Sequence, residues 1–393
     1  MQRVVIVGIG YTSRLGFIRS LGELGYIIEL IILESSNKKT IDQYSKYVKK
    51  VYSCHGNDEA SLLHILLTEC IDKEQKTILI PNNDFSATVL DKNYNLLKDY
   101  YLFPHIRNTQ GAITDWMNKE KQKAWASSVG LNVVESKNVI ITDRKYELPV
   151  GIHYPCFTKT RAYVTGYKHT LHRCDNEIEL RAVLDYLCTK HENLILMVED
   201  YKEIDQEYAV VGFSDGNEVI IPCVLEILSM AQGNVKGVAS QGKVVPLTGY
   251  EEIIGKFNKF ILGIGFVGLF DIDFYLSDGL LYFGELNLRI GGSGSAVVQM
   301  GVNLPEMLVR TMLGRSLVGM KKEISSSAVY VNERIVVENW YYGYLTTKEL
   351  INILHSSSIS FVKDKHDPLP GFIFKKRLIM MWLKRFLKKY LKK

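Results

Sequence analysis

Two short segments, Phe270-Asp271-Ile272-Asp273-Phe274-Tyr275 and Phe283-Gly284-Glu285-Leu286-Asn287-Leu288-Arg289, flank the turn-forming residues Ser277-Asp278-Gly279. Each segment alternates apolar with polar residues, which is the period of a β-strand. An Asp-Gly pair between two such runs is a strong signal for a hairpin. The sequence therefore predicts a two-stranded antiparallel unit over residues 270–289.

This hairpin carries an unusual number of polar side chains between its apolar positions. Side chains two residues apart in a strand point to the same face. The polar side chains expected together are Asp271, Asp273, Glu285, Asn287 and Arg289. Carboxylates this close repel each other unless a cation lies between them, and hard oxygen donors suit Mg²⁺, which also takes ligands from phosphates. A solvated strand face with a salt bridge to Arg289 is the alternative interpretation.

The hairpin resembles the metal- and phosphate-binding element of the ATP-grasp superfamily. In that superfamily one carboxylate precedes a Glu-x-Asn-x-Arg element, whose Glu and Asn hold one or two Mg²⁺ on the ATP phosphates. The metal ligands implied here are Asp273, Glu285 and Asn287. Asp273 fits the first carboxylate better than Asp271, and Arg289 matches the catalytic arginine that faces the acyl-phosphate site. Leu288 replaces the proline that usually precedes this arginine.

The resemblance extends upstream to the segment that would hold the base and ribose of ATP. Leu194–Val198 reads as a buried strand that delivers Glu199 to the adenine edge, with main-chain contacts from Asp200 and Tyr201. Glu207 stands where the superfamily places a ligand of the ribose hydroxyls, although it can also belong to a polar turn. The residues that the resemblance implies for nucleotide binding are Glu199, Asp200, Tyr201 and Glu207.

Two lysines match the phosphate-binding lysines of the superfamily. Lys159 follows a short predicted strand and corresponds to the lysine that reaches the α- and β-phosphates. Lys119 lies eleven residues before Gly130, which is the spacing of the first phosphate lysine. Lys121 and Lys123 stand beside it and weaken this assignment. A lysine supplies a mobile point charge, which suits a phosphate ligand.

Three loops are expected to border the site. Arg161–Lys168 contains one glycine where many members have a glycine-rich flap, so we expect either charged contacts from these two residues or a looser flap. Gly291–Ser295 is a run of small residues that lets backbone approach a ligand closely, and the resemblance implies that it borders the carboxylate substrate. Gly233–Gly242 reads as a mobile substrate loop or as an ordinary surface connection.

Strand signals at residues 3–8, 27–33 and 77–81 alternate with helix signals at 14–24, 61–70 and 87–99, which predicts an α/β fold with a parallel sheet. A further helix is expected over 115–129. The expected organisation is a Rossmann-like domain over 1–111, an ATP-grasp domain over 112–315 with lobes at 112–197 and 198–315 and antiparallel sheets, an α+β extension over 316–373, and a basic amphipathic tail over 374–393. Gly8-Ile9-Gly10 follows the first strand, but Ser13 replaces the third glycine of a dinucleotide fingerprint, which argues against NAD binding.

Composition limits the class of protein. The 393 residues are 47% hydrophobic, which predicts a sizeable core. The longest apolar run, Ile27–Leu33, is too short to cross a bilayer. Met1-Gln2-Arg3 leads directly into a predicted strand, so we expect no secretory signal and a cytoplasmic protein. The six cysteines form no CxxC pair, which favours free thiols over a zinc site or a disulfide framework.

The net charge of +5 is concentrated in the tail, where residues 374–393 carry nine Lys or Arg and no acid. The remaining chain has 39 basic and 43 acidic residues, which disfavours a nucleic-acid partner. Apolar residues recur in the tail at helical spacing. Such a helix either lies on an anionic membrane surface or docks on the protein's own body or on another subunit.

The resemblance implies an ATP- and Mg²⁺-dependent ligase, with Mn²⁺ as an alternative metal, that joins a small-molecule carboxylate to an amine. A homo-oligomer is also compatible with it. Two other classes stay open: an ATP-binding protein without ligation, and an oxidoreductase built on the N-terminal domain. Amino acids, peptides and sugar acids all remain candidate substrates, because the substrate-facing segments contain no motif that selects among them.

Overall fold

The computed structural model describes residues 1–9, 14–33, 39–160, 170–232 and 238–391. It divides into two compact units. The first contains residues 1–114, 208–272 and 287–393, and the second contains residues 115–207 and 273–286. Among the described residues, no helix has both the length and the apolar character needed to cross a membrane. All six cysteines are free thiols, as expected.

The first unit begins with a five-stranded parallel sheet of order β3-β2-β1-β4-β5. Its strands are β1 (Arg3–Gly8), β2 (Ile27–Leu33), β3 (Val48–Cys54), β4 (Thr77–Pro81) and β5 (Tyr101–Leu102). The predicted strands 3–8, 27–33 and 77–81 are confirmed, because each is an apolar run buried within the sheet. Strand β3 was not predicted, since Lys49 and Lys50 interrupt its apolar pattern.

Helices connect these parallel strands. They are α1 (Leu15–Glu23), α2 (Glu59–His64) with a π-helical continuation over Ile65–Glu69, α3 (Asp84–Lys92) and α4 (Tyr94–Leu97), together with a 3-10 turn at Asp42–Tyr44. The predicted single helix from Ala87 to Asp99 is wrong, because Asn93 separates α3 from α4. The carboxyl end of β4 leads directly into α3, whose first turn is held by the cap residue Asn83.

A second, largely antiparallel sheet has the order β17-β16-β12-β14-β15-β18-β19, with β13 on β12 and β6 on β16. Its strands are β6 (His105–Ile106), β12 (Gln206–Asp215), β13 (Val219–Ile220), β14 (Val224–Met230), β15 (Ala239–Val245), β16 (Phe266–Ser277), β17 (Leu280–Asn287), β18 (Ala328–Val331) and β19 (Ile359–Ser360). Helix α8 (Glu251–Ile264) precedes β16 and ends at Gly265, in a left-handed conformation that suits glycine. The predicted hairpin is confirmed as β16 and β17.

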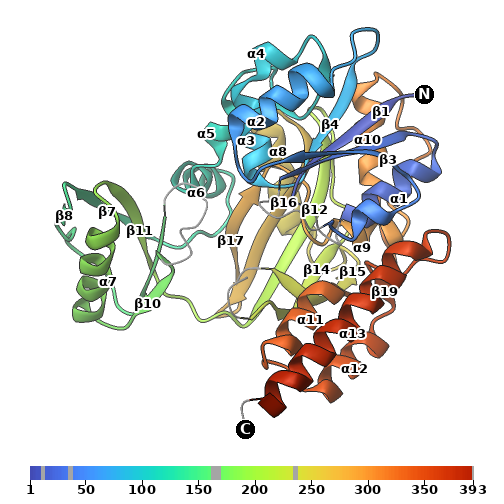
Figure 1. Cartoon of the computed structure of the whole chain (residues 1–393). Helices are drawn as coiled ribbons and strands as arrows, with labels where there is room; N and C mark the ends of the chain where they lie inside the picture. Colours follow the sequence, from blue (N-terminus) through green and yellow to red (C-terminus); the bar gives the residue numbers. More distant parts are fainter. Residues whose placement is uncertain (10–13, 34–38, 161–169, 233–237, 392–393) are drawn as a thin grey trace. The chain divides into compact units, whose positions relative to one another are not determined.

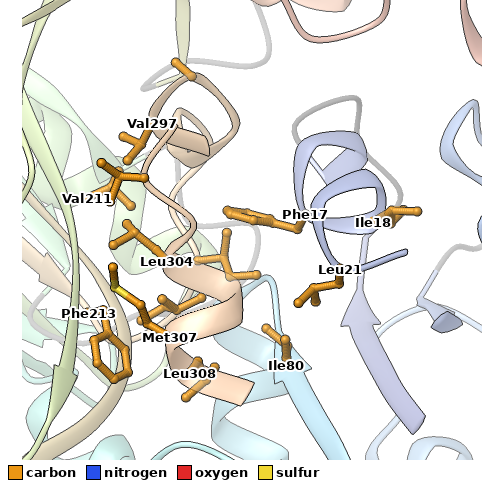
Figure 2. Close-up of a cluster of buried hydrophobic side chains, with 14 of the residues drawn as sticks. Phe17, Ile18, Leu21, Ile80, Val211, Phe213, Val297, Leu304, Met307 and Leu308 are labelled. Carbon is orange, nitrogen blue, oxygen red and sulfur yellow. The ribbon is translucent and has the colours of Figure 1, made fainter. Parts of the chain in front are cut away.

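One hydrophobic cluster joins the two sheets of the first unit (Figure 2). Phe17 and Leu21 of α1 face side chains of α10 (Leu304–Met312), including Met307 and Leu308. Val211 and Phe213 of β12 complete the same cluster, and all of these side chains are almost fully buried. The short helix α9 (Gly294–Gln299) also packs against α1. This core holds the parallel sheet and the segment after β17 in one body.

The second unit is built on an antiparallel sheet of order β10-β9-β11-β7-β8. Its elements are α5 (Ala112–Trp116, which begins in the first unit), α6 (Lys119–Ser128), β7 (Ser136–Thr142), β8 (Lys145–Tyr146), β9 (Cys156–Thr160), β10 (His172–Cys174), α7 (Glu177–Lys190) and β11 (Leu194–Asp200). Helix α7 lies against this sheet (Figure 1) and buries Leu180, Leu184 and Leu187. The predicted helix over 115–129 is wrong, because Asn118 caps a new helix.

The C-terminal segment of the first unit contains α11 (Glu333–Tyr341), α12 (Thr347–Ser356) and α13 (Pro368–Leu391), which lie together in Figure 1. The predicted tail helix is confirmed and begins six residues earlier than expected, at Pro368. Phe374, Leu378 and Met381 of α13 pack on the cluster around Trp340, and the guanidinium of Arg385 lies 4.7 Å from the centre of its ring. Of the alternatives for the tail, docking on the protein's own body is observed for this face of α13.

These observations confirm the expected fold class. A parallel α/β sheet and antiparallel sheets are both present, in the order that the sequence predicts. The domain boundaries at residues 111, 315 and 373 stay predictions.

Candidate nucleotide and metal site

The turn between β16 and β17 has the geometry that its sequence predicts. Asp278 and Gly279 both have positive φ, at 51° and 75°. Positive φ at both central residues is the signature of a type I′ turn, which matches the twist of a two-stranded hairpin. The rings of Tyr275 and Tyr282 stack with their centres 5.7 Å apart, so these two residues share a face of the hairpin. Asp273 lies on the same face, two residues before Tyr275.

The alternation of buried and exposed residues along β17 changes phase after Phe283. Phe283 is buried and so is Leu286, whereas Gly284 and Glu285 between them are both partly exposed. A Cβ added to Gly284 would lie 2.9 Å from the carbonyl oxygen of Asp273. This close approach puts Gly284 opposite Asp273, and the burial of both Phe283 and Leu286, three residues apart, shows that the alternation changes phase between them. Strict alternation from the turn would place Glu285 on the face opposite Asp273, so this change of phase favours a common face for the two carboxylates.

Lys119 contacts Glu285 in the second unit. Its Nζ lies 3.0 Å from Oε2 of Glu285, and the two side chains are 19% and 33% exposed. Lys119 is the first residue of α6, which Asn118 caps by accepting bonds from two backbone N–H groups. Gln122, on the same helix, donates to the carbonyl of Leu286 at 2.8 Å and accepts from its N–H at 3.0 Å. Gln122 thereby ties α6 to β17 and positions Lys119 beside Glu285.

A second group of charges surrounds Glu199 at the end of β11. Lys159 of β9 lies 2.6 Å from Oε1 of Glu199, and Lys123 of α6 contacts the same oxygen. Lys123 also donates to the carbonyl of Val134 at 2.8 Å. The structure thus brings two of the predicted residues, Lys159 and Glu199, together. It adds Lys123, which the sequence offered only as a competitor of Lys119.

Burial shapes the electrostatics of this group. Burial alone would raise the pKa of Glu199, but Lys159 and Lys123 outweigh it, so the pKa lies below its ordinary value. Burial lowers the pKa of Lys123, and the neighbouring Glu199 opposes that shift. An ion cluster that is mostly excluded from water is costly unless each charge keeps its partner. Glu199 is therefore held as a carboxylate between two ammonium groups.

The residues after Glu199 are partly engaged within the protein. The backbone N–H of Asp200 donates to the carbonyl of Glu135 at 3.1 Å, and that of Tyr201 donates to the carbonyl of Pro155 at 2.9 Å. A main-chain contact from either residue to a base would therefore use a carbonyl oxygen. Glu207, in β12, is half-buried, and burial raises the pKa of its carboxyl group.

Arg289 contacts two polar side chains within the first unit. Its Nε lies 2.8 Å from Oδ1 of Asp84, and its Nη2 donates to Oδ1 of Asn287 at 3.1 Å. Asp84 begins α3 at the carboxyl end of β4, and the sequence analysis missed it. The signal was available, because polar residues that follow a parallel strand stand where α/β sheets bind ligands.

Close packing leaves room only for glycine at position 291, in the loop after Arg289. A Cβ on Gly291 would lie 2.0 Å from Oδ2 of the buried Asp271, so a larger residue would displace that carboxylate. Asp271 therefore packs beneath this loop, whereas Asp273 is exposed. The predicted flap residues Arg161–Lys168 and positions 233–237 of the candidate substrate loop lie outside the described residues.

The amino-acid sequence is similar to part of a much longer enzyme chain. No family model matches the chain. It is 24% identical over 275 residues to the carbamoyl phosphate synthase large chain of Gemmatimonas aurantiaca, covering 65% of this chain and 25% of that protein. The chain spans about a quarter of the length of the curated relatives it matches.

Solved structures match over most of the chain. One is N5-carboxyaminoimidazole synthetase from Staphylococcus aureus complexed with ADP, with a TM-score of 0.61 and 19% identity over 84% of this chain and 81% of that one. Another is L-amino acid ligase from Bacillus licheniformis, with a TM-score of 0.61 and 16% identity over 84% and 79%. These likenesses confirm the resemblance predicted from the hairpin: the chain has the ATP-grasp fold.

Proposed function

We propose that the protein is an ATP-dependent ligase that activates a carboxylate as an acyl phosphate and transfers the acyl group to an amine. The pairing of Lys119 with Glu285 and of Lys159 with Glu199 carries this proposal. Both lysines that match phosphate-binding positions lie against carboxylates of the candidate site. Lys119 and Lys123 lie one helical turn apart on α6, and Lys123 shares Glu199 with Lys159, which supports a common phosphate-binding role for Lys119 and Lys159.

The donor set suits a hard divalent cation. Glu285 follows Gly284, which lies against the backbone of Asp273, and Asn287 follows Glu285 by two residues along β17. Carboxylate and amide oxygens are ligands that Mg²⁺ accepts, and Mn²⁺ takes the same donors. These three residues would hold the metal, whose chemistry is to neutralise charge on the transferring phosphoryl group. Lys119 would then exchange Glu285 for a phosphate oxygen.

The remaining residues would bind the nucleotide. Lys159 would reach the α- and β-phosphates, while Lys123 would stay on Glu199 and keep it ionised. Asp200 and Tyr201 would border the adenine, with a carbonyl oxygen accepting from its amino group. Glu207 would accept hydrogen bonds from the ribose hydroxyls.

The proposed reaction has two steps. An oxygen of the substrate carboxylate attacks the γ-phosphorus, the bond to the bridging oxygen breaks, and ADP leaves with that electron pair. The amine nitrogen then attacks the acyl carbon, loses a proton, and expels inorganic phosphate. Arg289 would stabilise the acyl phosphate through its guanidinium, which is suited to planar, charged oxygen groups. No nucleophilic side chain is required, because phosphoryl transfer depends chiefly on positioning and charge neutralisation.

The test is ADP release by the full chain with Mg²⁺-ATP and a panel of carboxylates and amines. We expect release to require a carboxylate, and hydroxylamine to trap the acyl phosphate as a hydroxamate. Glu285→Ala should abolish release, whereas Glu147→Ala, an exposed glutamate of the same unit, should not. Unchanged turnover in Glu285→Ala would overturn the metal assignment.

The same measurements separate the alternatives. ADP binding without release for any substrate pair would favour an ATP-binding protein without ligation. Binding of NAD(P), followed by nucleotide fluorescence, would favour an oxidoreductase. The cytoplasmic location and a homo-oligomeric state remain predictions, and size-exclusion chromatography with light scattering measures the latter.

A further inference from the structure

Helix α13 has two apolar faces, and the described part of the chain covers one of them. The covered face contains Phe374, Leu378 and Met381, which pack on the cluster around Trp340. The other face is an exposed stripe formed by Leu369, Phe372, Ile379, Met380, Leu383 and Leu387. Each of these six residues is between 48% and 64% exposed. Their spacing follows the helical period, so they form a continuous ridge opposite the covered face.

The charges on α13 all have one sign. Residues 368–393 contain nine Lys or Arg and no acid. Lys375, Lys376 and Lys384 are exposed and stand on or beside the stripe. A second copy of this helix would bring like charges together, which disfavours self-association through this face. The complementary partner is anionic, and it must also accept a ridge of large apolar side chains.

We propose that α13 attaches the protein to anionic membrane surfaces. A nucleic acid would satisfy the lysines but would leave the apolar stripe in water, whereas a lipid interface accommodates both. The stripe would enter the boundary between headgroups and acyl chains, and the lysines would contact the headgroups. The face that packs on α11 would remain bound to the protein, so attachment requires no unfolding of the docked helix. This inference is independent of the proposed ligase activity.

The experiment is co-sedimentation of the full chain with vesicles. We compare phosphatidylcholine alone with a 7:3 mixture of phosphatidylcholine and phosphatidylglycerol (roughly a third anionic lipid), at low and high salt. We expect the protein to sediment with the anionic vesicles, and high salt to weaken this binding. In the variant Lys375→Gln/Lys376→Gln/Lys384→Gln, each lost lysine should lower the partition coefficient between vesicles and solution about fivefold.

The apolar stripe is tested by Ile379→Glu/Leu383→Glu, which should abolish sedimentation. Ile140→Glu/Ile178→Glu is the matched control, because both residues are exposed and lie in the second unit, away from α13 in sequence. Thermal unfolding of each variant checks that it is folded. Absence of binding by the unaltered chain, equal binding to both vesicle types, or retained binding in Ile379→Glu/Leu383→Glu would overturn the proposal. So would a dimer that this variant converts to a monomer without any lipid dependence.

Discussion

Glu199 and Glu285 both pair with lysines of the candidate site, but their surroundings differ. The Glu199 side chain is 11% exposed and contacts two lysines, whereas that of Glu285 is 33% exposed and contacts Lys119. A buried charge that loses its partner is strongly destabilising, while a partly exposed pair contributes little to stability. Glu199 therefore maintains the structure at the end of β11, and Glu285 is available to exchange its lysine for a ligand.

The largest stability effect is expected for Glu199→Ala. It leaves the ammonium groups of Lys123 and Lys159 without their shared carboxylate, which should lower the free energy of unfolding by about 3–5 kcal/mol. Urea denaturation measures this loss. The triple variant Lys123→Met/Lys159→Met/Glu199→Leu should recover much of it, because apolar residues can replace a buried ion cluster. If Glu199→Ala lowers the free energy of unfolding by less than about 1 kcal/mol, this buried cluster contributes no more to stability than an exposed ion pair does.

Gly284→Ala should damage the metal site more than the fold. The added methyl group meets the backbone carbonyl of Asp273 at 2.9 Å, so one of the two strands must shift. A displacement of about 1 Å at a catalytic site can lower activity about 100-fold. The measurement is ADP release as a function of Mg²⁺ concentration, together with the rise of the unfolding midpoint on adding Mg²⁺. Gly255→Ala is the control, because its Cβ would meet no atom within 4 Å, and unaltered metal dependence in Gly284→Ala would show that the close approach to Asp273 does not shape the metal site.

Lys123→Met should change the pH dependence of the free energy of unfolding. The pKa of Glu199 is lowered in the folded protein, so its ion pairs stabilise the fold above the unfolded pKa of about 4.3. That stability is lost as the pH falls through the lower folded value. Removing Lys123 should raise the pKa of Glu199 and shift the acid transition upward.

Acid unfolding and ADP affinity between about pH 4 and pH 7, a range that spans the ordinary carboxyl values, both report this transition. Lys123→Arg keeps the charge and should leave the transition near its original position. If Lys123→Met lowers stability equally at every pH, then Lys123 acts by packing and has no effect on the ionisation of Glu199.

The smallest stability effect is expected for Glu285→Ala. Its pair with Lys119 is partly exposed, so the free energy of unfolding should fall by less than about 1 kcal/mol, although turnover should be lost. Parallel urea curves for Glu285→Ala and Glu199→Ala measure the contrast directly. A loss in Glu285→Ala as large as that in Glu199→Ala would remove the proposed distinction between a structural and an exchangeable carboxylate.

Sequence reasoning found the elements of the site more readily than their contacts. The hairpin and the strand before Glu199 follow from local alternation and turn chemistry. Gln122 was missed because its partner, Leu286, lies 164 residues away and its hydrogen bonds are to backbone. Asp84 was missed for the same reason, since 205 residues separate it from Arg289. Lys123 was detectable, because it lies one helical turn after Lys119 and therefore faces the same side of α6.

The hairpin shows where local rules end. Alternation places Glu285, Asn287 and Arg289 on one face, and it places Asp271 and Asp273 on one face. It does not say whether the two faces coincide, because one extra residue in either strand reverses the answer. The change of phase at Gly284 decides this, and it depends on how closely the backbone of Asp273 approaches.

Local sequence patterns predict the α/β order of elements, the acidic hairpin with its Asp-Gly turn, and a basic amphipathic helix at the C-terminal end. These depend on residues within a few positions of one another. Three features are visible only in the folded chain: which lysine contacts which carboxylate, the burial of Asp271 beside the exposed Asp273, and which face of α13 is covered. The physical reason is that burial and desolvation select partners across long sequence separations, and local periodicity carries no information about them.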